Sequence, residues 1–234
     1  MNITDFNMDY FSLKGKNAIV TGGNTGLGQA FSLALAKGGA NIFMPSIMPD
    51  DPKFNALIEA EGVKAVYMPG DMTKPGVPKQ IVEKCIETLG SVDILVNCAG
   101  ICICKPVLEF DRNEWDPMIS INLTAAFEMS HEVAKYMIPQ NSGKIINICS
   151  LFSFLGGQWS PAYAASKHGL AGLTKAYCDE LAQYNIQVNG IAPGYFKTKA
   201  AEASVNDPER NKWIVNHTAE QRWGEGGRRI SHFS

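Results

Sequence analysis

A serine, a tyrosine and a lysine lie close together in the second half of the chain, at a spacing that suits proton transfer. Tyr163 and Lys167 are four residues apart behind Pro161, where apolar residues recur at intervals of three and four, as in a helix. That spacing puts both side chains on one helix face. A neighbouring ammonium group favours the phenolate, so we expect a tyrosine pKa below its usual value of about 10. Such a tyrosine can exchange a proton with a carbinol or carbonyl oxygen.

Ser150 is the expected partner of this tyrosine. It ends an apolar run thirteen residues before Tyr163 and could hydrogen-bond the same substrate oxygen. Ser153 is a rival for this role, although the spacing favours Ser150. A Tyr-x-x-x-Lys pair is weak evidence by itself, because most such pairs lie on solvated helix surfaces, so the interpretation depends on the other motifs.

A glycine-rich turn near the N-terminus is the second motif. An apolar strand runs into Gly22, Gly26 and Gly28, spaced G-x-x-x-G-x-G, and a helical pattern follows. Glycines permit a tight turn and let backbone N–H groups and the helix N-terminus approach a pyrophosphate. An ordinary glycine turn is the alternative, but the strand–turn–helix context favours a nucleotide site.

Composition narrows the functional class. The 234 residues carry a formal net charge of −2, so neither nucleic acid nor an acidic membrane surface is an expected partner. We find no apolar run of membrane-spanning length and no leader-like N-terminus. The six cysteines are scattered, which is typical of reduced thiols in a cytoplasmic protein. Cys98, Cys102 and Cys104 cluster, but no second ligand pair follows at zinc-like spacing, so we predict no metal.

Strand and helix patterns alternate along the whole chain. Strands are expected at Ala18–Val20, Asn41–Met44, Ala65–Met68, Ile94–Asn97, Lys144–Ile148 and Gln187–Ile191, and helices near Gly26–Lys37, Pro52–Glu61, Gly76–Leu89, Glu114–Ile138 and Ala162–Tyr184. Apolar strands separated by helices predict an α/β fold: a single-domain, doubly wound parallel sheet in three layers. Ligands bind such sheets beyond the carboxyl ends of the strands, where all the motifs fall.

In combination, these motifs resemble the short-chain dehydrogenase/reductase family, which has a Rossmann-like fold. The resemblance rests on Thr21–Gly28, Asn97–Gly100, Asn122, Ser150 and Tyr163–Lys167, with Pro193-Gly194 after the sixth strand, and covers roughly residues 12–224. The amino-acid sequences of Lys144–Gly157 and Gly172–Ala176 resemble those of the 2-deoxy-D-gluconate 3-dehydrogenase and gluconate 5-dehydrogenase branch. The resemblance implies an NAD(P)-dependent oxidoreductase that acts on a keto or hydroxy sugar acid.

The resemblance also implies the catalytic roles. Tyr163 would be the acid/base, and Lys167 would lower its pKa and hold the nicotinamide ribose. Ser150 would orient the carbonyl. Asn122 would hold a water molecule on a proton path from Lys167, the alternative being a plain buried asparagine bonded to backbone. Gln158 would contact the substrate together with Ser150 and Tyr163.

The cofactor contacts follow from the same resemblance. Asp71 would cap the adenine, although it could equally mark a helix N-terminus. Asn97 would brace the central strands, with Ala99 and Gly100 leaving room for the cofactor, and Cys98 replaces a second family asparagine. The residues expected to contact the cofactor are Gly22, Asn24, Thr25, Gly26, Leu27, Gly28, Ser46, Asp71, Met72, Asn97, Ala99, Gly100, Tyr163, Lys167, Pro193 and Gly194.

The end of the second strand bears on the choice between NAD and NADP. A cation there marks NADP and an acidic residue marks NAD. The segment around Ser46 has neither, and the glycine turn has Asn24 and Thr25 where relatives that bind NADP often have a cation. The absence of cations favours NAD, with NADP as the alternative.

The C-terminal segment departs from the family. After Gly224 the resemblance stops, and residues 225–234 form an unrelated polar tail. We therefore expect a domain at 1–224 that lacks the seventh strand, and a homo-oligomer in which a dimer is favoured over the family's tetramer. Truncation of a longer family sequence is the favoured explanation, and a naturally short variant is the alternative. For the function, the alternative to an active oxidoreductase is a truncated, inactive or weakly active cofactor-binding remnant.

Overall fold

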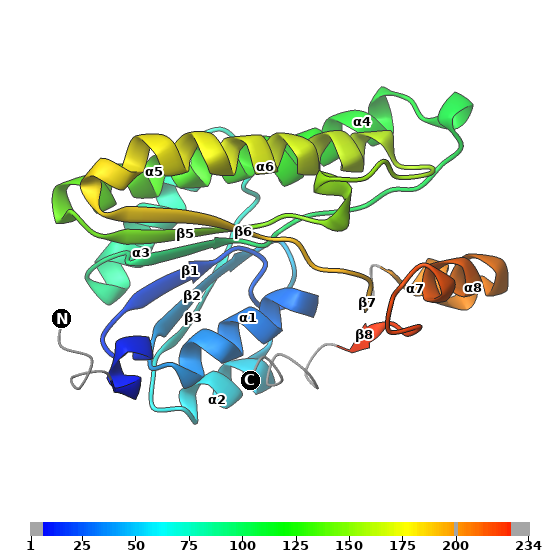
Figure 1. Cartoon of the computed structure of the whole chain (residues 1–234). Coiled ribbons are helices and arrows are strands. Elements are labelled where there is room, and N and C mark those ends of the chain that lie inside the picture. The colour runs from blue at the N-terminus through cyan, green and yellow to red at the C-terminus, as the bar shows by residue number, and fades with distance from the viewer. Residues whose placement is uncertain (1–6, 199–200, 226–234) are drawn as a thin grey trace.

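A six-stranded parallel sheet forms the centre of the molecule (Figure 1). The computed structural model describes residues 7–198 and 201–225. The strands are β1 (Asn17–Val20), β2 (Asn41–Ser46), β3 (Ala65–Pro69), β4 (Ile94–Asn97), β5 (Gly143–Ile148) and β6 (Ile186–Ile191). Their order is β3-β2-β1-β4-β5-β6, and every neighbouring pair is parallel. The prediction of a doubly wound parallel sheet is confirmed.

Helices cover both faces of the sheet and give the three predicted layers (Figure 1). The main helices are α1 (Gly26–Lys37), α2 (Pro52–Glu59), α3 (Val77–Leu89), α4 (Arg112–Ile119), α5 (Ala125–Gln140) and α6 (Pro161–Leu181). The expected helix Glu114–Ile138 is in fact α4 and α5 joined by a π-helical turn at Ser120–Thr124. Such turns are frequent at functional sites.

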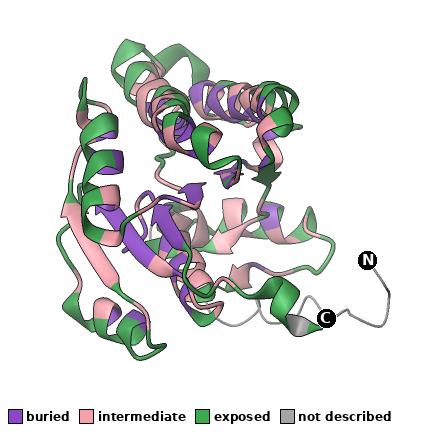
Figure 2. Cartoon of the chain, turned by 90° about the vertical axis from the view of Figure 1, so that its left-hand side faces the viewer, coloured by how far each residue is buried: buried purple, intermediate pink, exposed green. Residues whose placement is uncertain are grey.

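Alternating strand residues feed two separate hydrophobic cores. Ile19, Phe43 and Leu95 point to the side covered by α3 and α5. Their neighbours in sequence, such as Ala18 and Ile42, point to the side covered by α1 and α2. Because successive strand side chains face opposite ways, a strand buried on both faces must be apolar throughout. Figure 2 shows the buried residues gathered in the central strands and on the inward faces of the helices.

A small substructure follows β6. Helices α7 (Glu202–Asn206) and α8 (Pro208–Asn216) lie between two short parallel strands, β7 (Phe196–Lys197) and β8 (Gly224–Glu225). The sequence patterns did not predict this pair, and Glu225 of the expected polar tail belongs to it. The rest of that tail, from residue 226, lies outside the described residues. Within the described ranges, every helix is too short or too polar to cross a lipid bilayer.

Candidate active site

The glycine-rich turn between β1 and α1 is built for close approach of another group. Gly22 has φ +64°, and its N–H donates to Pro45 O at 2.9 Å. A Cβ on Gly28 would lie 2.2 Å from Gly22 O, so this close contact requires glycine. Thr25 precedes α1 without a side-chain capping bond, which leaves the first-turn N–H groups and the positive helix end to bind an anion. This arrangement fits the pyrophosphate of a dinucleotide.

Two buried polar side chains extend this region beyond the turn. Asn24 is 3% exposed, and its Nδ2 donates to Pro49 O at 2.8 Å. Its Oδ1 is buried and has no hydrogen-bond partner among the described residues. Ser46, at the end of β2, accepts a hydrogen bond from Met48 N at 3.1 Å. The next residue, Ile47, is 73% exposed. The predicted cofactor residues of β1, α1 and β2 therefore lie at one edge of the sheet.

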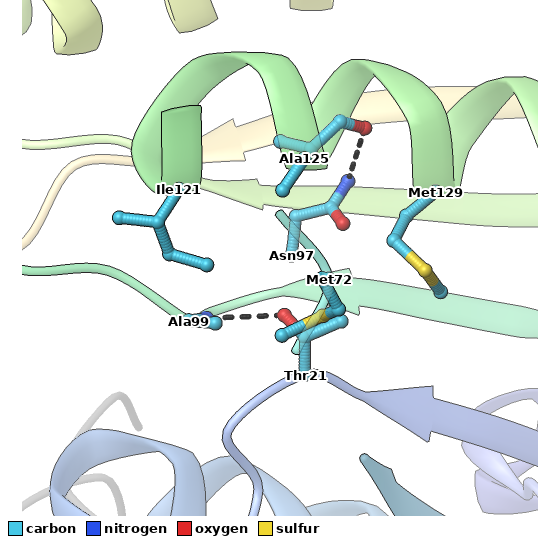
Figure 3. Close-up of a pocket in the computed structure, with 8 residues that line it drawn as sticks. Thr21, Met72, Asn97, Ala99, Ile121, Ala125 and Met129 are labelled. Atoms are coloured by element: carbon cyan, nitrogen blue, oxygen red, sulfur yellow. Dashed lines mark hydrogen bonds between the residues drawn. The ribbon is translucent and has the colours of Figure 1, made fainter. Parts of the chain in front are cut away.

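The central strand ends are tied together by side chains (Figure 3). Thr21 Oγ1 accepts hydrogen bonds from Cys98 N at 2.9 Å and Ala99 N at 3.0 Å. Asn97 Nδ2 donates to Asn147 Oδ1 at 2.8 Å, which links β4 to β5. A cavity of about 10 Å³ lies here, lined by Thr21, Met72, Asn97, Ala99, Ile121, Ala125, Ala126 and Met129. Asn97 therefore lies where it can brace the central strands β4 and β5.

Asp71 does not cap a helix. Its carboxylate accepts hydrogen bonds from Thr73 N at 3.0 Å and Thr73 Oγ1 at 2.6 Å. The hydrogen bonds from Thr73 lower the pKa of Asp71. Helix α3 begins only at Val77, after Gly76, so the interpretation of Asp71 as a helix N-terminal signal is wrong. The residue holds the loop that follows β3.

Tyr163 and Lys167 share one face of α6, as their spacing predicts. Tyr163 is hydrogen-bonded to Ser150, which follows β5. Lys167 is 5% exposed; its Nζ lies 5.6 Å from the Tyr163 ring centroid and donates to Ile148 O at 2.6 Å. The structure therefore brings three of the four predicted catalytic side chains, Ser150, Tyr163 and Lys167, together at the carboxyl end of β5.

The expected lowering of the Tyr163 pKa is not found in the chain itself. Burial raises the pKa of Tyr163 to about 12, and the hydrogen bond with Ser150 only partly opposes this effect. Burial also lowers the pKa of Lys167, because desolvation disfavours the charged form of either group. Desolvation is therefore the main influence on the pKa of Tyr163.

Asn122 is almost fully buried in the π-helical turn. Its Oδ1 accepts from Ile101 N and its Nδ2 donates to Ile101 O, both at 2.9 Å. A Cβ on Gly100 would lie 2.9 Å from Asn122 Oδ1 and 4.0 Å from Lys167 Nζ. Gly100 therefore allows the β4 loop to approach Asn122, in addition to the room expected for the cofactor. The side chain of Asn122 is bonded to backbone, as in the alternative reading.

The rival serine has a separate position. Ser153 Oγ donates to Lys167 O at 2.8 Å and accepts from Ser150 N at 3.3 Å, so it supports the loop and α6. Gln158 is exposed on the loop between Ser150 and Tyr163. Pro193 and Gly194 lie in the loop after β6.

The cysteine cluster lies beside the tyrosine. Cys102 and Cys104 are exposed, with their sulfur atoms 3.9 Å apart. The hydrogen bond with Cys102 lowers the pKa of Cys104 to about 6, and the charge of Arg210 acts in the same direction. Burial raises the pKa of Cys98 to about 11. Among the residues that the structure describes, no group of three or more His, Cys, Asp or Glu side chains could hold a metal ion.

Comparison with known proteins gives the family. Residues 16–209 match the family described as short chain dehydrogenase. The chain belongs to this family. Short-chain dehydrogenases are NAD(P)-dependent oxidoreductases that act on CH–OH groups, and the glycine turn and the Ser-Tyr-Lys group of this chain agree with that chemistry.

Relatives place this short-chain dehydrogenase close to the gluconate 5-dehydrogenase branch. It is 61% identical to the uncharacterized oxidoreductase YgcW of Escherichia coli (strain K12), covering 96% of this chain and 86% of that protein. It is 41% identical to the 5-keto-D-gluconate 5-reductase of the same strain, covering 93% and 86%. A solved structure of a gluconate 5-dehydrogenase from Burkholderia cenocepacia J2315, in complex with NADP and tartrate, is 35% identical, covers 93% and 86%, and gives a TM-score of 0.86.

The sequence patterns missed an aromatic cluster over the catalytic tyrosine. The Phe152 ring lies edge-on to Tyr163, with centroids 5.9 Å apart, and to Tyr195 at 6.4 Å. Tyr195 in turn meets Trp223 at 5.8 Å. Local sequence could not reveal this cluster, because its members come from three separate segments.

Proposed function

We propose that this short-chain dehydrogenase interconverts a ketone and a secondary alcohol on a sugar acid, with NAD as the preferred cofactor. The hydrogen-bonded pair of Ser150 and Tyr163, with Lys167 on the same helix face, carries the proposal. These side chains lie at the same sheet edge as the glycine turn, where the residues fit a dinucleotide.

Each catalytic residue has a defined task. In the reducing direction, Tyr163 donates its proton to the oxygen formed at the carbonyl, and Ser150 donates a hydrogen bond to the same oxygen. Lys167 stabilises the resulting tyrosinate electrostatically, and Asn122 keeps the β4 loop beside it. The bound nicotinamide supplies the hydride in this direction and accepts it in the other.

A half-buried tyrosine with a raised pKa suits the reducing direction. Because the phenol of Tyr163 keeps its proton at neutral pH, it is ready to act as an acid. Oxidation requires tyrosinate and should therefore be favoured by alkaline pH. The protonated state of Tyr163 therefore supports ketone reduction as the favoured direction at neutral pH.

The substrate class and the cofactor preference rest on different observations. The sugar acid is supported by the relationship to the 5-keto-D-gluconate 5-reductase. NAD is supported by the lack of a cation at Ser46 and in the glycine turn, whereas the Burkholderia relative was crystallised with NADP. A panel of 2-keto, 3-keto and 5-keto sugar acids, assayed with NADH and NADPH, tests both points. Cofactor binding without turnover of any member would contradict the proposal.

The assembly and location form a separate part of the proposal. We infer one catalytic domain over residues 1–224 that forms a homodimer through α5 and α6, because Phe127 on α5 is 45% exposed and stacks only on His131 within the described chain. A cytoplasmic site of action is supported by six free cysteines. Light scattering should show a dimer that Phe127→Glu converts to a monomer; a monomeric parent chain would overturn the assembly.

A further inference from the structure

An arginine on α8 has aromatic neighbours but, within residues 7–198 and 201–225, no acidic partner. Arg210 Cζ lies 5.2 Å from the Trp159 ring centroid and 5.1 Å from that of Trp213. Among the described residues, Arg112 and Arg222 form ion pairs with Asp116 and Glu220. Within the same part of the chain, the Arg210 guanidinium has no ion pair or hydrogen bond. A guanidinium stacked on aromatic rings keeps its in-plane N–H groups for a planar anion.

The partners of Arg210 are held firmly from both sides. Trp159 has φ +65°, a left-handed conformation that is costly for a bulky residue, and its carbonyl oxygen accepts from Lys105 N at 2.7 Å. On α8, Asn211 Oδ1 accepts from Trp223 Nε1 at 2.8 Å, and Ile214 is 1% exposed. Both walls of the guanidinium site are therefore set before any ligand binds.

Electrostatic interactions and ring contacts relate Arg210 to the catalytic tyrosine. Its charge acts on Cys104, which also interacts electrostatically with Tyr163. Its charge acts likewise on Tyr195, whose ring meets Phe152, and Phe152 meets Tyr163. In addition, Trp159 is four residues before Tyr163 on the loop that leads into α6. The unpaired guanidinium thus lies on the substrate side of the site.

We infer that Arg210, whose guanidinium lies against Trp159 and Trp213, binds the carboxylate of the substrate. The ketone of the same substrate then lies against Tyr163. The inference rests on the proposed function and adds the group that separates sugar acids from neutral sugars. Arginine binds a carboxylate through two parallel hydrogen bonds, which fix orientation as well as charge. Adjacent indole rings reduce competition from water.

The test compares an acid with its neutral counterpart. Arg210→Gln should raise the KM for 5-keto-D-gluconate about tenfold to hundredfold, the range expected for loss of a charge-assisted pair. The KM for L-sorbose, in which a CH2OH group replaces the carboxylate, should change less than twofold. Lys212→Gln, an exposed charge on the same helix, is the matched control and should change neither value. An equal rise for both substrates would assign Arg210 a purely structural role and overturn the inference.

A binding measurement separates this inference from the proposed reaction. D-gluconate should change the tryptophan fluorescence of the parent chain, because Trp159 and Trp213 flank the site, and Arg210→Gln should abolish the response while keeping the melting temperature. Gluconate binding without turnover of any sugar acid would leave the receptor standing and contradict the proposed function. Turnover of 5-keto-D-gluconate that is unaffected by Arg210→Gln and Arg210→Lys would leave the function standing and contradict the receptor.

Discussion

Two regions of the proposed site differ in how far their side chains are exposed. The nucleotide side is formed by the ends of β1, β2 and β4, and the substrate side by the loops that follow β4 and β5. On the nucleotide side, Thr21, Asn24 and Asn97 are 2%, 3% and 5% exposed and are bonded mainly to neighbouring strands and loops. In the loops that follow β4 and Ser150, by contrast, Leu108 and Phe154 are 98% and 71% exposed. The buried edge of the sheet suits a dinucleotide, a ligand shared by many enzymes. Exposed loops can differ in sequence between relatives without destabilising the sheet, and so can suit different substrates.

The largest expected effect is on kcat, and it tests Tyr163, which lies between the nucleotide side and the substrate side. Tyr163→Phe removes the proton donor but keeps the ring that packs on Phe152, so kcat should fall by roughly 10²–10⁴-fold. Cofactor affinity, measured by fluorescence titration with NADH, should change little. Tyr177→Phe on the same helix is the control. A kcat within threefold of the parent would show that Tyr163 is not the acid/base.

The next effect is confined to the nucleotide side. Gly28→Ala places a methyl group 2.2 Å from Gly22 O, and such overpacking typically costs about 1–3 kcal/mol. The Kd for the cofactor should therefore rise about fivefold to hundredfold. Gly172→Ala in α6 has no atom within 4 Å of the added Cβ and should leave this Kd unchanged. Equal affinities for the two variants would exclude a cofactor contact at the turn.

A smaller effect concerns cofactor choice at the rim of the nucleotide side. The parent chain should bind NADH more tightly than NADPH. Ile47→Arg adds a cation at an exposed position beside Ser46, and a charge-assisted bond of about 1.5–3 kcal/mol would shift the preference towards NADPH about tenfold or more. Ile47→Gln controls for side-chain length. Tighter binding of NADPH by the parent chain would refute the preference for NAD.

The smallest effect measures the electrostatics of the substrate side. With the pKa of Cys104 lowered to about 6, its thiolate predominates at neutral pH and is lost as the pH falls through that value. The rate of iodoacetamide labelling should therefore drop about tenfold from pH 7 to pH 5. Peptide mapping by mass spectrometry isolates this site, with Cys104→Ser as the control. Arg210→Gln should move the pH profile of Cys104 labelling to higher pH. An unchanged profile would show that the charge of Arg210 does not act on the Cys104 thiol.

Most of the fold could be predicted from local patterns. Strand and helix positions were largely correct because a strand buried on both faces must be mostly apolar, as at Ala18–Val20, and because Gly26 and Pro161 mark helix starts. The π-helical turn at Ser120–Thr124 was missed, since its sequence continues an ordinary helical pattern. The β7–β8 pair was missed because two-residue strands carry no periodicity.

The sequence by itself determined the types and order of the chemical groups: the glycine turn, Ser150, Tyr163 and Lys167. Each motif is local in sequence, and parallel strands end at the same edge of the sheet, so helix geometry and strand ends are enough to place the groups there. Only the tertiary structure decided the surroundings, since burial depends on segments distant in sequence. It reversed the expected shift of the Tyr163 pKa, and it brought Arg210 to Trp159, 51 residues away in sequence.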